Sequence, residues 1–314
     1  MRRVIGIGET VLDIIFRGKE PIQAVPGGSA FNAIISLGRA GVPATFISET
    51  GNDRVGEWVI SFLKENGVDS SNVCVFPDSK SPISLAFLDE QNNAQYLFYK
   101  DHPHDQLDFV YPEVNPDDVV VFGSFFAINP VIRPQVMGFL EYARNHGAIL
   151  YYDVNYRASH KNELLRVTPN IIENLEMADI VRGSNEDFEI MYRKNDADAV
   201  YRSEISFYTK KFIYTQGPNP VELRAEGGLK KQYPVVPIEG SVVSTIGAGD
   251  NFNAGFVYGM MKHNITRQVI DQGLTEQQWD QVIACAQQFS AQVCRSLNNS
   301  IDHDFGQQMK QALP

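Results

Sequence analysis

Short apolar segments alternate with longer amphipathic segments along most of this chain. The strand-like segments are residues 3–7, 44–49, 119–122, 149–153, 180–182 and 212–215. The helix-like segments are residues 30–40, 55–66, 134–145, 249–263 and 276–297, with a short final helix before the C-terminus. This alternation is typical of parallel strands joined by helical crossovers. We therefore predict an α/β fold with a doubly wound, mostly parallel sheet flanked by helices.

One region departs from this alternation. Residues 83–88 and 94–100 are both strand-like and are separated by the turn-rich residues 89–93, which indicates an antiparallel hairpin. With residues 14–23 the hairpin is predicted to form a small sheet. We expect this sheet to be a lid that closes over a site and excludes water, and its edges favour a homodimer through the lid. The predicted organisation is one domain over residues 1–314, with a β lid from residues 14–25 and 81–103.

The composition excludes several classes of protein. With 314 residues and 43% hydrophobic content, the chain is long enough to bury one large core. Its formal charge of −11 opposes nucleic acid binding, and no apolar run reaches the roughly 20 residues that cross a bilayer. The first residues lead into a strand rather than a signal segment. We predict a cytoplasmic protein without a nucleic acid or membrane partner, with reduced thiols at Cys74, Cys285 and Cys294.

The run Gly247-Ala248-Gly249-Asp250 places an acid inside a glycine turn that opens a helix. Glycines allow close backbone approach to a ligand, and the first amides of a helix form an anion site. A phosphate held there would repel Asp250, whereas a base that takes a proton from an attacking hydroxyl would belong beside it. An ordinary helix start remains an alternative, because the helix dipole favours an acid in the first turn.

Further polar residues follow predicted strands, where open α/β sheets bind ligands. These are Asp13, the segment 27–32 with Gly28 and Asn32, the segment 153–157, and Thr215 with Gly217. Carboxylate and amide side chains suit a polyhydroxylated substrate, because each can bind neighbouring hydroxyls. The alternatives are a close helix-to-strand turn at Gly27 and Gly28 and an ordinary loop acid at Asp13.

Competing motifs do not fit. Gly6-x-Gly8 lacks the third glycine of a dinucleotide fingerprint, and no segment has the spacing of a phosphate-binding P-loop. The segment 27–31 lacks the last glycine of a hydrolase nucleophile elbow. His102 and His104 flank Pro103 without a third nearby ligand, which favours a loop at the edge of the lid over a metal site.

Two signatures together identify a family resemblance. Residues 27–32 with 37–41 resemble the N-terminal signature of the ribokinase-like carbohydrate kinases, the phosphofructokinase B type family. Residues 247–250 with 253–256 resemble its C-terminal signature, and Asp153-x-Asn155-x-Arg157 and Thr215-x-Gly217 lie between them. Residues 8–13 and 97–101 are most similar to fructokinases. The resemblance covers nearly the whole chain and implies a ribokinase-like fold.

The resemblance also implies roles for individual residues. Asp250 would be the base that activates a primary sugar hydroxyl, and the amides around Gly247, Ala248 and Gly249 would stabilise the transferring phosphoryl group. The sugar would be bound by Asp13, Gly28, Asn32, Phe98, Lys100, Asn155 and Arg157. The nucleotide would be bound by Ser184, Thr215, Gly217 and Asn298. Mg²⁺ would be held mainly by phosphates and waters, with Asp187 or Glu186 acting through water.

Two positions depart from the family pattern. The family commonly has Glu three residues after the residue that aligns with Ser184, whereas this chain has Asp187 there and Glu186 beside it. Ser244 stands where many relatives have Asp near a monovalent-cation loop, which weakens any prediction of potassium activation. The implied activity is an ATP-dependent sugar kinase acting on fructose or a related ketose or keto sugar acid. The alternatives are a ribose, nucleoside or 2-keto-3-deoxygluconate kinase, or a non-catalytic sugar or nucleotide sensor.

Overall fold

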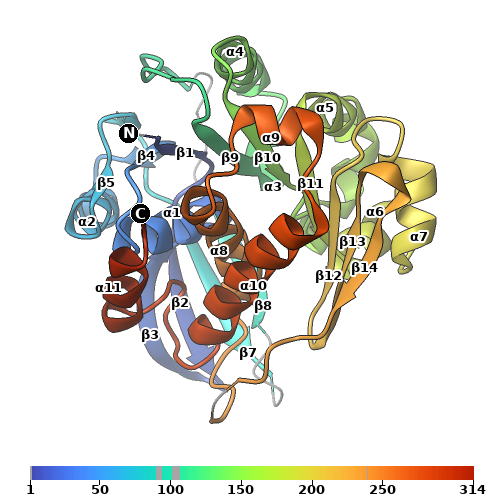
Figure 1. Cartoon of the computed structure of the whole chain (residues 1–314). Coiled ribbons are helices and arrows are strands. Elements are labelled where there is room, and N and C mark those ends of the chain that lie inside the picture. Colours follow the sequence, from blue (N-terminus) through green and yellow to red (C-terminus); the bar gives the residue numbers. More distant parts are fainter. Residues whose placement is uncertain (1, 90–93, 101–106, 239) are drawn as a thin grey trace. The chain divides into compact units, whose positions relative to one another are not determined.

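The computed structural model describes residues 2–89, 94–100, 107–238 and 240–314, and Figure 1 shows the chain coloured along its sequence. The chain divides into two compact units. The first unit comprises Met1–Pro112, Val236–Ile265 and Glu276–Pro314, and the second comprises Glu113–Val235 and Thr266–Thr275. The turn of the lid hairpin and both His102 and His104 lie outside the described residues. The organisation as a single domain stays a prediction.

Parallel strands form the centre of the first unit. They are β1 (Val4–Ile7), β4 (Ala44–Gly51), β5 (Val68–Asp69) and β6 (Val73–Phe76). β4 pairs in parallel with each of the other three. All four residues of β1 are buried, as expected for an apolar strand of a parallel sheet that is covered on both faces.

Helices of the first unit come from both ends of the chain. They are α1 (Ser29–Arg39), α2 (Arg54–Glu65), α8 (Ala248–Lys262), α10 (Glu276–Val293) and α11 (His303–Gln311). α8 lies beside α10 (Figure 1), and α1 also packs on α8. Gly255 permits the close approach, because a Cβ atom there would lie 2.4 Å from the Cys285 carbonyl oxygen. α10 ends at Val293, four residues before the predicted end at Leu297, and the chain then turns through a polar segment.

A separate small sheet belongs to the first unit and has the order β3-β2-β7-β8. Its strands are β2 (Val11–Arg17), β3 (Glu20–Gly27), β7 (Ile83–Leu88) and β8 (Ala94–Tyr99). β7 and β8 form the predicted antiparallel hairpin, and β2 pairs in parallel with β7. The predicted segment 14–23 is itself part of an antiparallel hairpin of β2 and β3, which turns at Gly18 with φ 62°. Asp13 therefore lies inside β2 rather than at a strand end.

The second unit carries a six-stranded run in the order β14-β13-β12-β11-β10-β9. Its strands are β9 (Val119–Gly123), β10 (Ile149–Asp153), β11 (Ile180–Ser184), β12 (Phe212–Gln216), β13 (Asn219–Arg224) and β14 (Lys230–Tyr233). β9 to β12 pair in parallel, whereas β12, β13 and β14 pair antiparallel. The carboxyl ends of β10, β11 and β12 therefore lie at one edge of this run.

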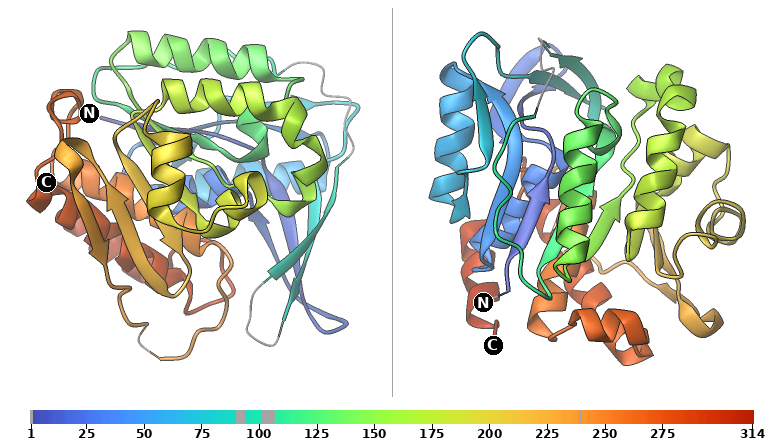
Figure 2. Two further views of the ribbon diagram at one scale, coloured as in Figure 1. Left: turned by 90° about the vertical axis from the view of Figure 1, so that its right-hand side faces the viewer. Right: turned by 90° about the horizontal axis from the view of Figure 1, so that it is seen from above.

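Helices alternate with the parallel strands of the second unit. They are α3 (Ser124–Ile128), α4 (Arg133–Asn145), α5 (Leu164–Met177), α6 (Asn185–Tyr192), α7 (Ala197–Val200) and α9 (Arg267–Gln272). α4 and α5 pack on β10 and lie side by side, as the green and yellow-green helices in Figure 2 show. The prediction of mostly parallel strands flanked by helices, with a separate small sheet, is confirmed.

Candidate active site

The glycine turn before α8 has a conformation that requires glycine. Gly247 has φ 74°, in the left-handed region, and a Cβ atom there would lie 2.7 Å from the Asn299 carbonyl oxygen. α8 begins at the next residue, so Gly249 and Asp250 belong to a first turn whose amides have no intrahelical acceptor. The Ala248 amide donates to the Thr245 carbonyl at 3.2 Å. The turn thus places a carboxylate beside helix-start amides.

Asp250 meets a second predicted residue. Its side chain is buried, with 8% of the residue exposed, and Asn32 Nδ2 donates to Asp250 Oδ2 at 2.8 Å. Asn32 lies in the first turns of α1, and its own amide donates to the Gly28 carbonyl at 2.8 Å. This carboxylate therefore joins two segments that are 218 residues apart in sequence.

Asp13 is held by two neutral donors. Ser84 Oγ donates to Asp13 Oδ1, and Asn299 Nδ2 donates to Asp13 Oδ2 at 2.7 Å. The pKa of Asp13 is raised to about 6, mainly by burial and to a smaller extent by the charges of Asp250 and Glu9, while the two hydrogen bonds oppose the rise. The carboxylate is therefore more basic than an exposed aspartate.

The two glycines after β3 leave room for this arrangement. A Cβ atom at Gly27 would lie 2.2 Å from Asp13 Oδ2, and one at Gly28 would lie 2.2 Å from the Glu9 carbonyl oxygen. Gly28 also has φ 124°, which residues with a side chain rarely adopt. Close approach to Asp13, rather than a helix-to-strand turn alone, thus accounts for Gly27.

The small sheet places predicted Phe98 on the face that carries Asp13. Asp13, Ser84 and Phe98 are direct partners across β2, β7 and β8, so their side chains share one face. Lys100 forms an ion pair with Glu9, and its Nζ lies 5.8 Å from the centroid of the Phe98 ring. Burial raises the pKa of the neighbouring Glu49 to about 7, an effect that Lys100 opposes.

In the second unit a buried arginine, Arg182, forms hydrogen bonds to residues at the carboxyl ends of two other strands. Arg182 Nη1 donates to Asp153 Oδ1 at 2.9 Å, and Nη2 donates to Thr215 Oγ1 at 2.6 Å. Burial opposes the charge of Arg182, but Asp153 and Asp187 outweigh this effect and raise its pKa. Predicted Thr215 is thereby linked to two charged residues at the carboxyl ends of β10 and β11.

Ser184 and Asp187 form a capping box at the start of α6. Ser184 Oγ accepts from the Asp187 amide at 3.2 Å, and the Ser184 amide donates to Asp187 Oδ2 at 2.6 Å. Burial raises the pKa of Asp187, as does the charge of Asp153. Glu186 is exposed. Within the described ranges, no group of three or more His, Cys, Asp or Glu side chains is arranged to hold a metal ion.

The remaining predicted residues lie nearer the surface or in loops. Asn155 is buried after β10 with φ 38°, whereas Arg157 beyond it is exposed. Gly217 lies in the turn between β12 and β13 with φ 57°, and Asn298 is exposed and accepts from Gln23 Nε2 at 3.0 Å. Ser244 is buried, and its hydroxyl accepts from the Ile246 amide at 3.1 Å.

Sequence reasoning missed the polar side chains that support this site. Asn251 Nδ2 donates to the carbonyls of Gly247 and Asn299, both at 2.8 Å, and Ser36 Oγ donates to Asn251 Oδ1 at 2.6 Å. Ser84 and Asn299 hold Asp13, as described above. The polar run 298–300 was the only sequence signal for Asn299. The nucleotide role predicted for Asn298 stays a prediction.

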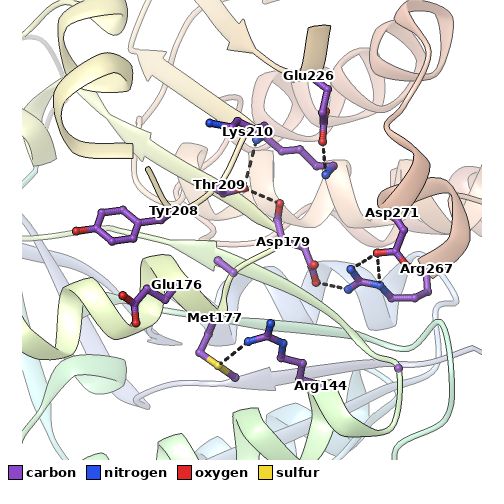
Figure 3. Close-up of a pocket in the computed structure, with 13 residues that line it drawn as sticks. Arg144, Glu176, Met177, Asp179, Tyr208, Thr209, Lys210, Glu226, Arg267 and Asp271 are labelled. Atoms are coloured by element: carbon purple, nitrogen blue, oxygen red, sulfur yellow. Dashed lines mark hydrogen bonds and ion pairs between the residues drawn. The ribbon is translucent and has the colours of Figure 1, made fainter. Parts of the chain in front are cut away.

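A cavity of about 520 Å³ lies elsewhere in the second unit (Figure 3). It lies at the amino ends of β10, β11 and β12, opposite to the ends that carry the predicted residues. Its charged groups pair largely with one another: Arg267 contacts Asp179 and Asp271, and Lys211 contacts Glu226. None of the predicted site residues lines it.

The helices of the described residues include none that is long and apolar enough to span a membrane.

Comparisons with known proteins show relatives of this chain in sequence and in fold. The chain is 28% identical over 254 residues to a 5-dehydro-2-deoxygluconokinase of Geobacillus thermodenitrificans (strain NG80-2), covering 75% of this chain and 72% of the relative. It is 27% identical over 271 residues to a fructokinase of Rhizobium leguminosarum bv. trifolii, covering 83% and 81%. The fold is similar to that of a Vibrio cholerae O395 fructokinase, solved with fructose, ADP and calcium ion, with a TM-score of 0.81, 19% identity and coverage of 95% and 94%. The pfkB family carbohydrate kinase model matches residues 1–303, and the chain belongs to this family of carbohydrate kinases.

Proposed function

We propose that the protein is an ATP-dependent kinase that phosphorylates a primary hydroxyl of fructose or a related ketose. The observation that carries this proposal is the placement of Asp250, which is buried in the first turn of α8 behind Gly247 and is oriented by Asn32. A carboxylate here would repel a phosphate that was only bound, but it can act as a base for a hydroxyl that attacks the phosphate. Family membership and the kinase relatives support the same reaction.

In the proposed reaction Asp250 takes the proton of the sugar hydroxyl. The hydroxyl oxygen forms a bond to the γ-phosphorus, and the bond between that phosphorus and the terminal oxygen of ADP breaks. Positioning and electrostatic stabilisation carry most of such a transfer. Asn32 fixes the rotation of the Asp250 carboxylate, while the helix-start amides face the charge that develops on the phosphoryl group.

The sugar is proposed to be bound through Asp13, Gly28 and Asn32. Phe98 and Lys100 act from the lid, and Asn155 and Arg157 remain proposed sugar residues of the second unit. The buried Asp13 carboxylate accepts hydrogen bonds and suits neighbouring hydroxyls. A substrate without those hydroxyls leaves the carboxylate unpaired, which is a strong source of specificity.

The nucleotide is proposed to be bound by Ser184, Thr215, Gly217 and Asn298. The donor set does not form a protein cage for Mg²⁺, since the Asp187 carboxylate caps α6 and Glu186 is exposed. This fits an ion that keeps its waters and is held mainly by phosphates, where it neutralises their charge. Ser244 offers a neutral hydroxyl that already accepts from a backbone amide, so we do not expect a requirement for potassium.

The proposal is tested with purified protein, Mg-ATP and a panel of sugars, with the sugar phosphate as the measured product. Fructose is expected to be turned over, and Asp250→Asn is expected to lower kcat by about 10²–10⁴ while sugar binding persists. Asp304→Asn, an exposed acid of α11, is the matched control and should keep full activity. Binding without turnover across the panel would favour the sensor alternative.

A keto sugar acid is the second candidate substrate. Lys100 lies on the same strand face as Phe98 and supplies a cation for a carboxylate, and one relative is named for 5-dehydro-2-deoxygluconate. Glu9 already pairs with Lys100, which favours a neutral sugar. Comparing kcat/KM for fructose and 5-dehydro-2-deoxygluconate in wild type and Lys100→Met decides between them. A selective loss for the acid in the variant would support this second candidate.

The partner proposed for the outer face of the small sheet is a second copy of the chain. Leu97 and Tyr99 alternate with Phe98 along β8 and are 54% and 56% exposed on the opposite face. An apolar face of this kind suits a self-complementary interface. Light scattering should give a dimer for wild type and a monomer for Leu97→Glu. A monomeric wild type would contradict this proposal.

A further inference from the structure

Asn299 connects Asp13 with the turn that precedes Asp250 in the first unit. Asn299 is 1% exposed, and its Nδ2 donates to Asp13 Oδ2 at 2.7 Å. Its backbone carbonyl accepts from Asn251 Nδ2 at 2.8 Å, and the same Nδ2 donates to the Gly247 carbonyl. One residue thus contacts the proposed sugar carboxylate through its side chain and the turn before Asp250 through its backbone.

The hydrogen bonding of Asn299 is directed at Asp13. An ionised carboxylate only accepts hydrogen bonds, so the amide nitrogen must face it. Within the part of the chain that the structure describes, Asn299 Oδ1 is buried without a hydrogen-bond partner. Leaving such an oxygen unpaired is unfavourable for folding, so local stability alone does not explain the asparagine. Donation to Asp13 does explain it.

We propose that Asn299 is a positioning residue that orients Asp13 toward the sugar and keeps it in register with the turn that precedes Asp250. This inference rests on the proposed function for the roles of Asp13 and Asp250. Asn299 acts through Asp13, so it governs sugar affinity. Asn251 shapes the turn and is joined to α1 through Ser36, so it governs the phosphoryl transfer step.

The charges that face Asp13 are those of Asp250 and Glu9, and the side-chain donors are Ser84 and Asn299. Both donors lower the pKa of Asp13. Removing either donor should therefore move the acid limb of sugar binding to higher pH. This direction is specific to a donor role, because a general loss of packing does not shift a titration upward in this way.

The test compares Asn299→Ala, Ser84→Ala and Asn251→Ala with wild type. Asn299→Ala should raise KM for the sugar about tenfold to hundredfold, as expected for loss of a hydrogen bond to a charge, and should change kcat less. Its KM should begin to rise at a higher pH than in wild type, and Ser84→Ala should show the same shift. Asn251→Ala should lower kcat more than it raises KM.

Asn299→Asp provides a sharper test because the variant is isosteric. Two adjacent carboxyl groups share a proton, so lowering the pH from about 8 toward about 6 should restore a donor and decrease KM. In wild type KM should increase as the pH falls below about 6, since Asp13 becomes protonated. The same pH dependence in both proteins would overturn the proposal.

A second measurement separates this inference from the proposed function. Carbon-13 NMR of the Asp13 carboxyl reports its pKa without turnover, and the pKa should be higher in Asn299→Ala and in Ser84→Ala. If wild type phosphorylates no sugar, the proposed function fails while the titration still tests the contact. The positioning role would be overturned if Asn299→Ala had the same KM, pH profile and Asp13 titration as wild type. Ser84→Ala provides the same titration should Asn299→Ala fail to fold.

Discussion

Buried carboxylates in the two units are stabilised in different ways. In the first unit Asp13 and Asp250 are bound by neutral amides and a hydroxyl, from Asn299, Asn32 and Ser84. In the second unit Asp153 is bound by the guanidinium of Arg182. Burial and the charge of Asp153 raise the pKa of Asp187, and Arg182 opposes this rise.

The difference teaches which carboxylates are able to accept protons or sugar hydroxyls. Neutral donors orient a carboxylate without cancelling its charge. Burial raises the pKa of Asp13 to about 6 despite these donors, so its proton equilibrium falls close to neutral pH. The guanidinium of Arg182 instead places a positive charge against Asp153 and joins it to Thr215. This difference supports the reactive roles proposed above for Asp13 and Asp250 and a structural role for Asp153.

Removing Arg182 should have the largest effect on stability. Arg182→Met leaves Asp153 buried without its cation, and we expect the free energy of unfolding to fall by about 3–5 kcal/mol in chemical denaturation. Adding Asp153→Asn should recover part of the loss, because the unpaired charge is then removed. Arg166→Met, at an exposed pair with Glu163, should change stability by less than about 0.5 kcal/mol. Equal effects at the two arginines would break the comparison.

Replacing Asp13 should make stability depend differently on pH. The folded-state pKa of Asp13 is raised from 3.8 to about 6, so its contribution to stability is present below about pH 4 and is lost as the pH rises through about 6. Relative to wild type, Asp13→Asn should gain about 3 kcal/mol between about pH 4 and about pH 8. Urea unfolding at several pH values measures this difference. A difference that stays constant with pH would show that Asp13 titrates normally.

The smallest expected effect on stability comes from the start of α6, which has a side-chain cap that the start of α8 lacks. Ser184→Ala removes the capping hydroxyl of α6 and should lower the free energy of unfolding by about 1 kcal/mol. Ser61→Ala, in the exposed middle of α2, should stay within about 0.5 kcal/mol of wild type. α8 has no side-chain cap at Gly247. Thermal unfolding of the two serine variants measures the difference, and equal melting temperatures would contradict a capping role.

Much of the fold could be predicted from local patterns. The predicted strand 149–153 agrees with β10 at both ends, and the predicted helices at 55–66 and 134–145 agree with α2 and α4 within one residue. The antiparallel hairpin of residues 83–88 and 94–100 was likewise predicted from its alternating apolar residues and its turn. Local hydrophobic periodicity carries this information because it reports which face of each element is buried.

Local sequence patterns were enough to predict the class of fold, the glycine turn before Asp250 and the family signatures around Asp13, Asn32 and Asp250. Packing in three dimensions decided that Asn299 contacts Asp13, from which it is 286 residues distant in sequence. It also decided that Asn251 joins the turn to α1. A single hydrogen bond between distant segments leaves no periodic pattern in the chain. Its partners are set only when packing brings their elements together and burial makes an unpaired polar group unfavourable.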